Sequence, residues 1–209
     1  MITLIVPFYN ESLHLLRCIS SIKSQSFQDY EVILIDDLST DDSYQLAQDL
    51  TEEDPHFRLL CNKHKGLYQA RNYALAEARG EYICFLDADD ELLPDYLSGL
   101  NEDGNHATAD LVVQGFTHVV NGGQDRVSVK HSGPFSKPDD AQSLFSSFDI
   151  VDMGNVFGKL YRRKIVEEYH LQFSPHVLLS EDMFFVVSYL IHCQTIYLSE
   201  KTNYLYIAH

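Results

Sequence analysis

Short apolar runs alternate with amphipathic segments through the first half of the chain. Four runs are mostly apolar and predict strands, and the run at residues 31–35 is typical of a parallel strand buried on both faces. These predicted strands cover residues 3–8, 31–35, 57–61 and 82–86. Two of the predicted helices begin after capping residues, one after Asn10 and one after residues 39–42. A third helix spans residues 66–78 and ends before Gly80, and Pro94 begins a further helical turn. The first helix would bury Leu13, Leu16, Ile19 and Ile22.

Strands and helices at this spacing predict an α/β fold, with a mainly parallel sheet and right-handed helical crossovers. Ligands of such sheets bind outside the carboxyl ends of the strands. Three of the predicted strands end in polar or acidic residues, at residues 7–10, 36–37 and 87–90. A site is therefore expected at this edge of the sheet.

The pattern changes after about residue 100. Residues 103–105 (Asp-Gly-Asn) predict a loop, and residues 111–120 and 126–131 predict a hairpin across Asn-Gly-Gly. The other predicted elements are short helices at residues 143–148 and 161–169, a longer helix at 181–192 and an aromatic strand at 197–206.

Composition narrows the class of protein. A chain of 209 residues with 45% hydrophobic residues supports one domain. It has no apolar stretch of about 18 residues, and its start predicts a strand, not a signal peptide. Four scattered cysteines predict reduced core thiols in a cytosolic protein.

A net charge of −16 argues against nucleic acid and anionic lipid as partners. A ligand with phosphates would need local neutralisation, which a divalent cation held by carboxylates supplies. Asp87 and Asp89 are placed to reach one cation, and such oxygen donors suit Mg²⁺ or Mn²⁺. The alternative is an acidic loop that caps the helix near Pro94.

Three further features of the predicted edge point to a nucleotide. Asp37 could accept a hydrogen bond from a pyrimidine ring, and Tyr9 could stack on that ring. For Asp36, capping of the next helix is almost equally favoured. Arg71 lies one turn into a helix whose N-terminus can face phosphates, and a guanidinium binds phosphate through two hydrogen bonds. Basic residues 63–65 are more typical of a solvated loop.

Glu181 and Asp182 precede an apolar helix. Acidic residues in a first helical turn commonly stabilise the helix dipole, which is the simpler interpretation. The functional interpretation is a general base.

Together these segments resemble the family 2 glycosyltransferases, a large group with the GT-A fold, over nearly the whole chain. The opening Ile-Val-Pro-Phe-Tyr-Asn is similar to the family's first signature, and Asp-Asp-Leu-Ser-Thr-Asp to its second. The central block at residues 66–72 and 78–90 is nearly word for word, and residues 159–163 and 181–185 are similar to the acceptor-side motifs.

The resemblance implies an inverting, non-processive transfer of a sugar from a nucleotide diphosphate, most commonly a uridine one, onto an acceptor hydroxyl. Residues 1–100 would form the nucleotide-sugar half of a Rossmann-like sheet with helices on both faces. Residues 101–209 would form an α+β acceptor-side half. The acceptor would be a glycan or a lipid-linked glycan in surface polysaccharide or glycoconjugate synthesis. The expected location is the cytoplasm, either free or at the inner face of the membrane.

The resemblance also implies roles for single residues. Tyr9 would stack on the base, Asp37 would hydrogen-bond it, and Pro7 would contribute its carbonyl. Arg71 would hold part of the nucleotide. Asp87 would bind the ribose or, through water, the metal, and Asp89 would be a metal ligand. Asp182 would be the general base, and Glu181 would orient it.

The chain departs from the family pattern in two places. Where members often have Tyr-x-Tyr-Arg-x-His, it has Ile207 in place of Arg and ends at His209, which is a further candidate metal ligand. Members commonly continue past this point, so we expect either a truncated chain or a short member of the family with an incomplete acceptor site. The second departure is the absence of tryptophan and of Gln-x-x-Arg-Trp, which argues against a processive synthase.

Three other functions fit parts of the pattern. A haloacid-dehalogenase-type phosphatase would use Asp87 as its nucleophile, but its motif usually lies near the N-terminus and continues differently. A sugar-nucleotide-binding subunit that has lost transfer activity is a second alternative, although the presence of Asp89 and Asp182 argues against it. A nucleotidyltransferase would need a glycine-rich, lysine-bearing N-terminal loop, which the sequence does not have.

Overall fold

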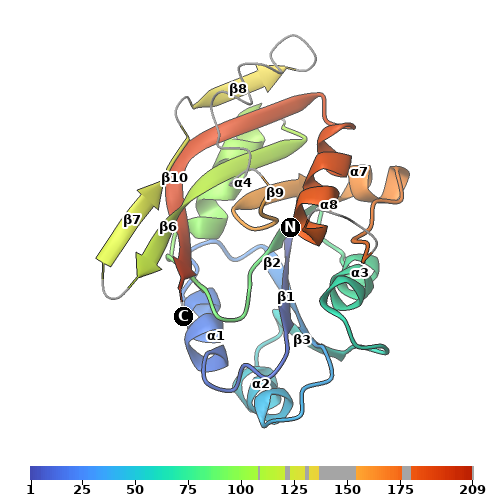
Figure 1. The fold of residues 1–209 in the computed structure, drawn as a ribbon. Coiled ribbons are helices and arrows are strands. Elements are labelled where there is room, and N and C mark those ends of the chain that lie inside the picture. Colours follow the sequence, from blue (N-terminus) through green and yellow to red (C-terminus); the bar gives the residue numbers. More distant parts are fainter. Residues whose placement is uncertain (108, 121–122, 130–131, 137–153, 176–179, 209) are drawn as a thin grey trace.

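The described residues form a ten-stranded mixed sheet with helices on both faces (Figure 1). The computed structural model describes residues 1–107, 109–120, 123–129, 132–136, 154–175 and 180–208. The strands are β1 (Ile2–Phe8), β2 (Tyr30–Asp36), β3 (Phe57–Cys61), β4 (Tyr82–Phe85), β5 (Glu91–Leu92), β6 (Leu111–Val120), β7 (Gly123–Val127), β8 (Gly133–Ser136), β9 (Lys159–Arg162) and β10 (Thr195–Ile207).

Two apolar layers enclose the sheet because side chains alternate between its faces. In β1, Leu4 and Val6 face one layer and Ile5 faces the other. The first layer is covered by α1 (Leu15–Lys23), α2 (Ser43–Thr51) and α4 (Tyr96–Ala107). The second layer is covered by α3 (Leu67–Glu77), α7 (Arg163–Glu168) and α8 (Glu181–Leu190).

The strand order is β3-β2-β1-β4-β9-β6-β10-β5, with β7 beside β6 and β8 beside β10. The first four strands are parallel, whereas β9 runs antiparallel to both β4 and β6. This arrangement confirms the α/β class. The strand order reverses at β1, which has β2 on one side and β4 on the other, and a reversal of this kind marks the ligand edge of an open sheet.

The start of the first helix differs from the prediction. Asn10 does not cap it: its backbone has a φ of 55°, and its side chain accepts a hydrogen bond from the Thr40 N–H at 2.8 Å. The helix begins at Leu15. The buried face is consequently turned, so Leu13 and Leu16 are exposed while Leu15, Cys18, Ile19 and Ile22 are buried.

The second half contains more regular structure than predicted. Residues 103–105, where a loop was expected, lie inside α4 (Tyr96–Ala107). Gly104 has a packing role there, since it lets the helix lie close to Leu160 and Val112. The predicted helix at 161–169 divides into β9 and α7. The hairpin is confirmed, although β7 begins earlier than expected, and β8 was not predicted. The predicted helix at 143–148 lies outside the described residues.

Two smaller expectations can be compared with the structure. Cys18, Cys84 and Cys193 are buried free thiols, as expected, but Cys61 is exposed because it ends the edge strand β3. Among the described residues, no helix has both the length and the apolar character needed to cross a membrane.

Gly80 is required for space, not as a left-handed helix stop, because its φ is not positive. A Cβ at this position would lie 2.5 Å from the Thr3 backbone nitrogen and 2.8 Å from the Tyr82 carbonyl oxygen. We therefore predict that Gly80→Ala lowers the free energy of unfolding by about 1–3 kcal/mol, the usual cost of overpacking, measured by urea denaturation. Gly123→Ala is the control, since its Cβ would meet nothing closer than 3.4 Å. Equal stability of the two variants would contradict this explanation.

Candidate functional site

The ends of β1, β2 and β4 lie at one edge because the three strands are parallel neighbours. The ladder between β1 and β4 ends early, with the Leu86 N–H donating to the Ile5 carbonyl at 3.0 Å. Alternate carbonyls of a strand face the same neighbour, so the Pro7 carbonyl points toward the space beyond the end of β4. The candidate donor side of the site surrounds this space.

Arg71 is the centre of a charged cluster that joins the two halves of the chain. Its Nη2 donates to Asp87 Oδ1 at 3.2 Å, and its Nη1 donates to Glu181 Oε1 at 3.4 Å and to Asp182 Oδ1. The side chain is only 2% exposed, and its guanidinium lies 5.1 Å from the centre of the Phe173 ring. One cation therefore faces three carboxylates at the predicted catalytic position.

Burial and charge act in opposite directions in this cluster. Burial alone would lower the pKa of Arg71, but Asp87, Asp182 and Glu181 outweigh it and raise that pKa. Burial raises the pKa of Asp87 and of Glu181, although the charge of Arg71 opposes both shifts. The cluster retains an excess of negative charge, which favours a proton or a cation nearby.

Asp37 is held by protein groups at the end of β2. Its carboxylate accepts from Asn62 Nδ2 at 2.7 Å and from the Gly66 N–H at 2.8 Å. Asp37 thus fixes the loop that leads into α3. Its neighbour Asp36 accepts from the Ser39 N–H at 3.2 Å and has a turn-forming role.

Tyr9 is exposed at the end of β1, where a base could stack. Lys65 lies against it: its Nζ donates to the Tyr9 hydroxyl at 2.7 Å and lies 3.9 Å from the ring centre. This hydrogen bond is the main reason why the pKa of Tyr9 is lowered. Residues 63–65 form an exposed loop, as the sequence predicted, and Lys65 brings this loop against Tyr9 at the candidate site.

A metal would have to be held by few protein groups. Asp87 and Asp89 are half-buried on the loop after β4. The described residues contain no group of three or more His, Cys, Asp or Glu side chains able to hold a metal ion, and His209 lies outside them. Two carboxylates fit Mg²⁺ or Mn²⁺ when substrate phosphates and water complete the shell.

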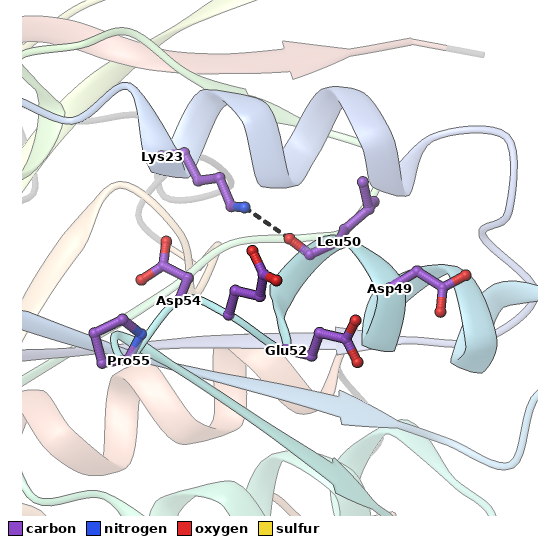
Figure 2. A pocket seen from close by; sticks show the side chains of 7 residues that line it. Lys23, Asp49, Leu50, Glu52, Asp54 and Pro55 are labelled. Carbon is purple, nitrogen blue, oxygen red and sulfur yellow. Dashed lines mark hydrogen bonds between the residues drawn. The ribbon is translucent and has the colours of Figure 1, made fainter.

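A second acidic surface lies at the opposite end of the sheet. A hollow of about 610 Å³ lies beside the ends of α1 and α2, where the Lys23 ammonium donates to the Leu50 carbonyl at 2.7 Å (Figure 2). Its carboxylates come from Asp49, Glu52, Glu53 and Asp54. Because it borders the amino ends of the strands, we do not assign it to the candidate site.

Three residues of the site had no signal in the sequence. Asn62 holds Asp37, Phe173 packs against Arg71, and Arg17 donates to the Asp89 carbonyl at 2.8 Å. Each acts through the tertiary structure on a residue that the sequence did single out. A periodicity pattern could not have found them.

Comparisons with known proteins agree with this geometry. The sequence profile of Glycosyl transferase family 2 matches residues 3–170. Glycosyltransferase EpsJ of Bacillus subtilis is 28% identical over 208 residues, which is 99% of this chain and 60% of that protein. The chain therefore spans about 60% of the length of this relative.

Two solved structures have a similar fold. TarS of S. aureus in complex with UDP has a TM-score of 0.85 at 23% identity, covering 99% of this chain and 60% of that one. Mannosyltransferase PcManGT of Pyrobaculum calidifontis, in complex with GDP-Man and Mn²⁺, has a TM-score of 0.71 at 19% identity, covering 99% and 56%. These similarities confirm the expected GT-A fold.

The profile match covers most of the chain and includes the strand ends that carry Tyr9, Asp37, Asp87 and Asp89. This assignment leaves no place for the phosphatase alternative, in which Asp87 would be a nucleophile. The chain belongs to glycosyl transferase family 2.

Proposed function

We propose that the chain is an inverting glycosyltransferase that transfers a sugar from a UDP-sugar donor to a hydroxyl of a glycan or lipid-linked acceptor. The observation that carries the proposal is the cluster around Arg71. It brings Asp182 of α8 to Asp87 at the end of β4, although the two acids are far apart in the sequence.

The donor would bind at the edge formed by residues 1–100. Tyr9 would stack on the base, Asp37 would hydrogen-bond it through its remaining acceptor capacity, and the Pro7 carbonyl faces the same space. Asp87 and Asp89 would hold Mg²⁺ or Mn²⁺. Such a cation supplies positive charge to the departing diphosphate, which then needs no proton. TarS with UDP-GlcNAc, a structure of the same fold, supports a UDP-sugar donor.

The acceptor would bind on the side formed by residues 101–209. Asp182 lies in the first turn of α8, whose cap Ser180 accepts from the Met183 N–H at 3.2 Å. Asp182 thus lies at the positive end of the helix dipole and beside Arg71, and it would take the proton of the acceptor hydroxyl as the general base. Glu181 binds the same guanidinium and would orient Asp182.

Arg71 is almost fully buried, so we propose that it acts on the donor through Asp87. Its two terminal nitrogens bind Asp182 and Asp87, which would lie on opposite sides of the reacting sugar. Arg71 would thereby fix the separation between the leaving diphosphate and the base. A single displacement across that separation inverts the anomeric centre, as in inverting hydrolysis.

An enzyme with a lipid-linked acceptor would work at the face of the membrane that carries this acceptor. We therefore propose a cytoplasmic enzyme with peripheral access to that face. This location follows from the proposed acceptor and would change with it.

Asp182→Asn tests the general base. The variant should keep nucleotide-sugar affinity within a few-fold, because the base acts on the acceptor proton, and should lower the transfer rate by at least about 10²-fold. Calorimetry and a product assay measure the two quantities. Asp125→Asn, an exposed change on β7, is the control. Transfer at the parental rate would exclude Asp182 as the base and direct attention to Glu181.

Asp89→Asn tests the metal. It should abolish the part of UDP affinity that depends on Mn²⁺ and leave the melting temperature of the ligand-free protein unchanged. Asp49→Asn, in the acidic hollow of Figure 2, should have no effect on either quantity. If EDTA left the UDP affinity of the parent unchanged, the metal assignment would be wrong.

Arg71→Met tests the cluster in the metal-free protein. Removing one partner of a buried ion pair costs about 3–5 kcal/mol, so unfolding at neutral pH should be easier by that amount. Asp87 and Glu181 already have raised pKa values, and these would rise further. The folded variant would then bind more protons than the unfolded chain, so its stability should fall as the pH rises from about 5 to 8.

The control for this experiment is Arg163→Met, which breaks a more exposed pair with Glu167. Its loss of stability should be smaller and should change little over the same pH range. An Arg71→Met variant with a pH-independent loss would show that the three carboxylates do not depend on Arg71 for their charge.

A further inference from the structure

The loop that carries Asp87 and Asp89 is fastened to the last strand of the fold. The Tyr204 hydroxyl, on β10, donates to Asp90 Oδ2 at 2.6 Å and accepts from the Asp87 N–H at 3.3 Å. The other oxygen of Asp90 accepts from the Ile207 N–H at 2.8 Å. A single phenol oxygen thus contacts the loop at two points, on either side of Asp89.

The phenol itself has little freedom to move. Tyr204 is fully buried, its ring stacks on Phe157 with centroids 4.4 Å apart, and the edge of Tyr96 lies against it at 6.0 Å. The backbone is also fixed, because Tyr204 pairs with Leu92 in the ladder between β10 and β5. The hydroxyl therefore has a defined position relative to the loop.

Asp90 is unlike its two acidic neighbours. It is 1% exposed, whereas Asp87 and Asp89 are half-buried. Both of its oxygens are bound by β10, and its own N–H donates to the Asp87 carbonyl at 3.0 Å, closing a turn across Asp89. A buried carboxylate with these partners would have to move if one of them were removed.

We propose that Tyr204 and Asp90 are positioning residues that fix the spacing of the Asp87 and Asp89 carboxylates for a divalent cation. This inference rests on the proposed metal role of those two acids. Groups that hold metal ligands in place typically change metal affinity by 10–100-fold when they are removed. Because β10 belongs to the acceptor-side half, that half would set the geometry of the donor's metal.

Tyr204→Phe removes one oxygen and keeps the packed ring. The probe is Mn²⁺ alone, titrated into the protein with saturating UDP, with free Mn²⁺ followed by electron paramagnetic resonance against a protein-free UDP titration. We expect Mn²⁺ affinity to fall by about tenfold or more. UDP affinity in EDTA should stay within about twofold of the parent.

Tyr30→Phe is the matched control. It also removes a hydroxyl from a buried tyrosine, which donates to the Ile22 carbonyl at 3.4 Å, but at the start of β2, far along the strand from the site. Its Mn²⁺ affinity should equal that of the parent. Asp90→Asn is a second test variant, used if Tyr204→Phe fails to fold, and should weaken Mn²⁺ binding in the same way.

The outcomes separate the inference from the proposed function. If the parent binds Mn²⁺ with UDP and Tyr204→Phe binds it equally well, the positioning role is overturned and the metal role of Asp89 stands. An equal loss of UDP affinity with and without Mn²⁺ would also overturn it, by showing a general structural role. A parent with no Mn²⁺-dependent UDP binding would overturn both ideas together.

Discussion

One buried guanidinium holds the two halves of this protein in register. Arg71 lies on α3, in the first half of the chain, and donates to two acids at the start of α8 and to one at the end of β4. Burying a charge is costly unless hydrogen-bonded partners of opposite charge surround it. The position of α8 over the sheet is therefore tied to the position of the loop after β4.

The sequence was most informative about the parallel strands and the residues at their carboxyl ends. Short, mostly apolar runs predicted the four parallel strands, and parallel geometry then predicted that Tyr9, Asp37 and Asp87 lie at one edge. No ligand geometry was needed for this inference, because the carboxyl ends of neighbouring parallel strands must coincide. The residues of the donor side were therefore predictable as a group.

Contacts between distant segments were less predictable. Arg71 was expected to face phosphate because it lies near a helix N-terminus. Nothing in the sequence of its helix indicates that α8 brings two acids to it. Asn10 was expected to cap a helix, but its left-handed backbone and its bond to Thr40 depend on a neighbouring loop. Gly104 indicated a loop, although it marks a close approach of α4 to the sheet. In each case, a tertiary partner outweighed the local preference.

The position of β10 has a consequence for the order of folding. This strand, residues 195–207, lies between β6 and β5, so β6 has an open edge until the chain has been synthesised past it. Its pairing with β6 joins segments more than 80 residues apart, as in Ile196 with Leu111, and such non-local contacts form slowly. A nascent chain would meanwhile expose an apolar strand edge, which is a site for aggregation. Chaperone capture during synthesis would therefore protect this half of the sheet more than the half formed by β1 to β4.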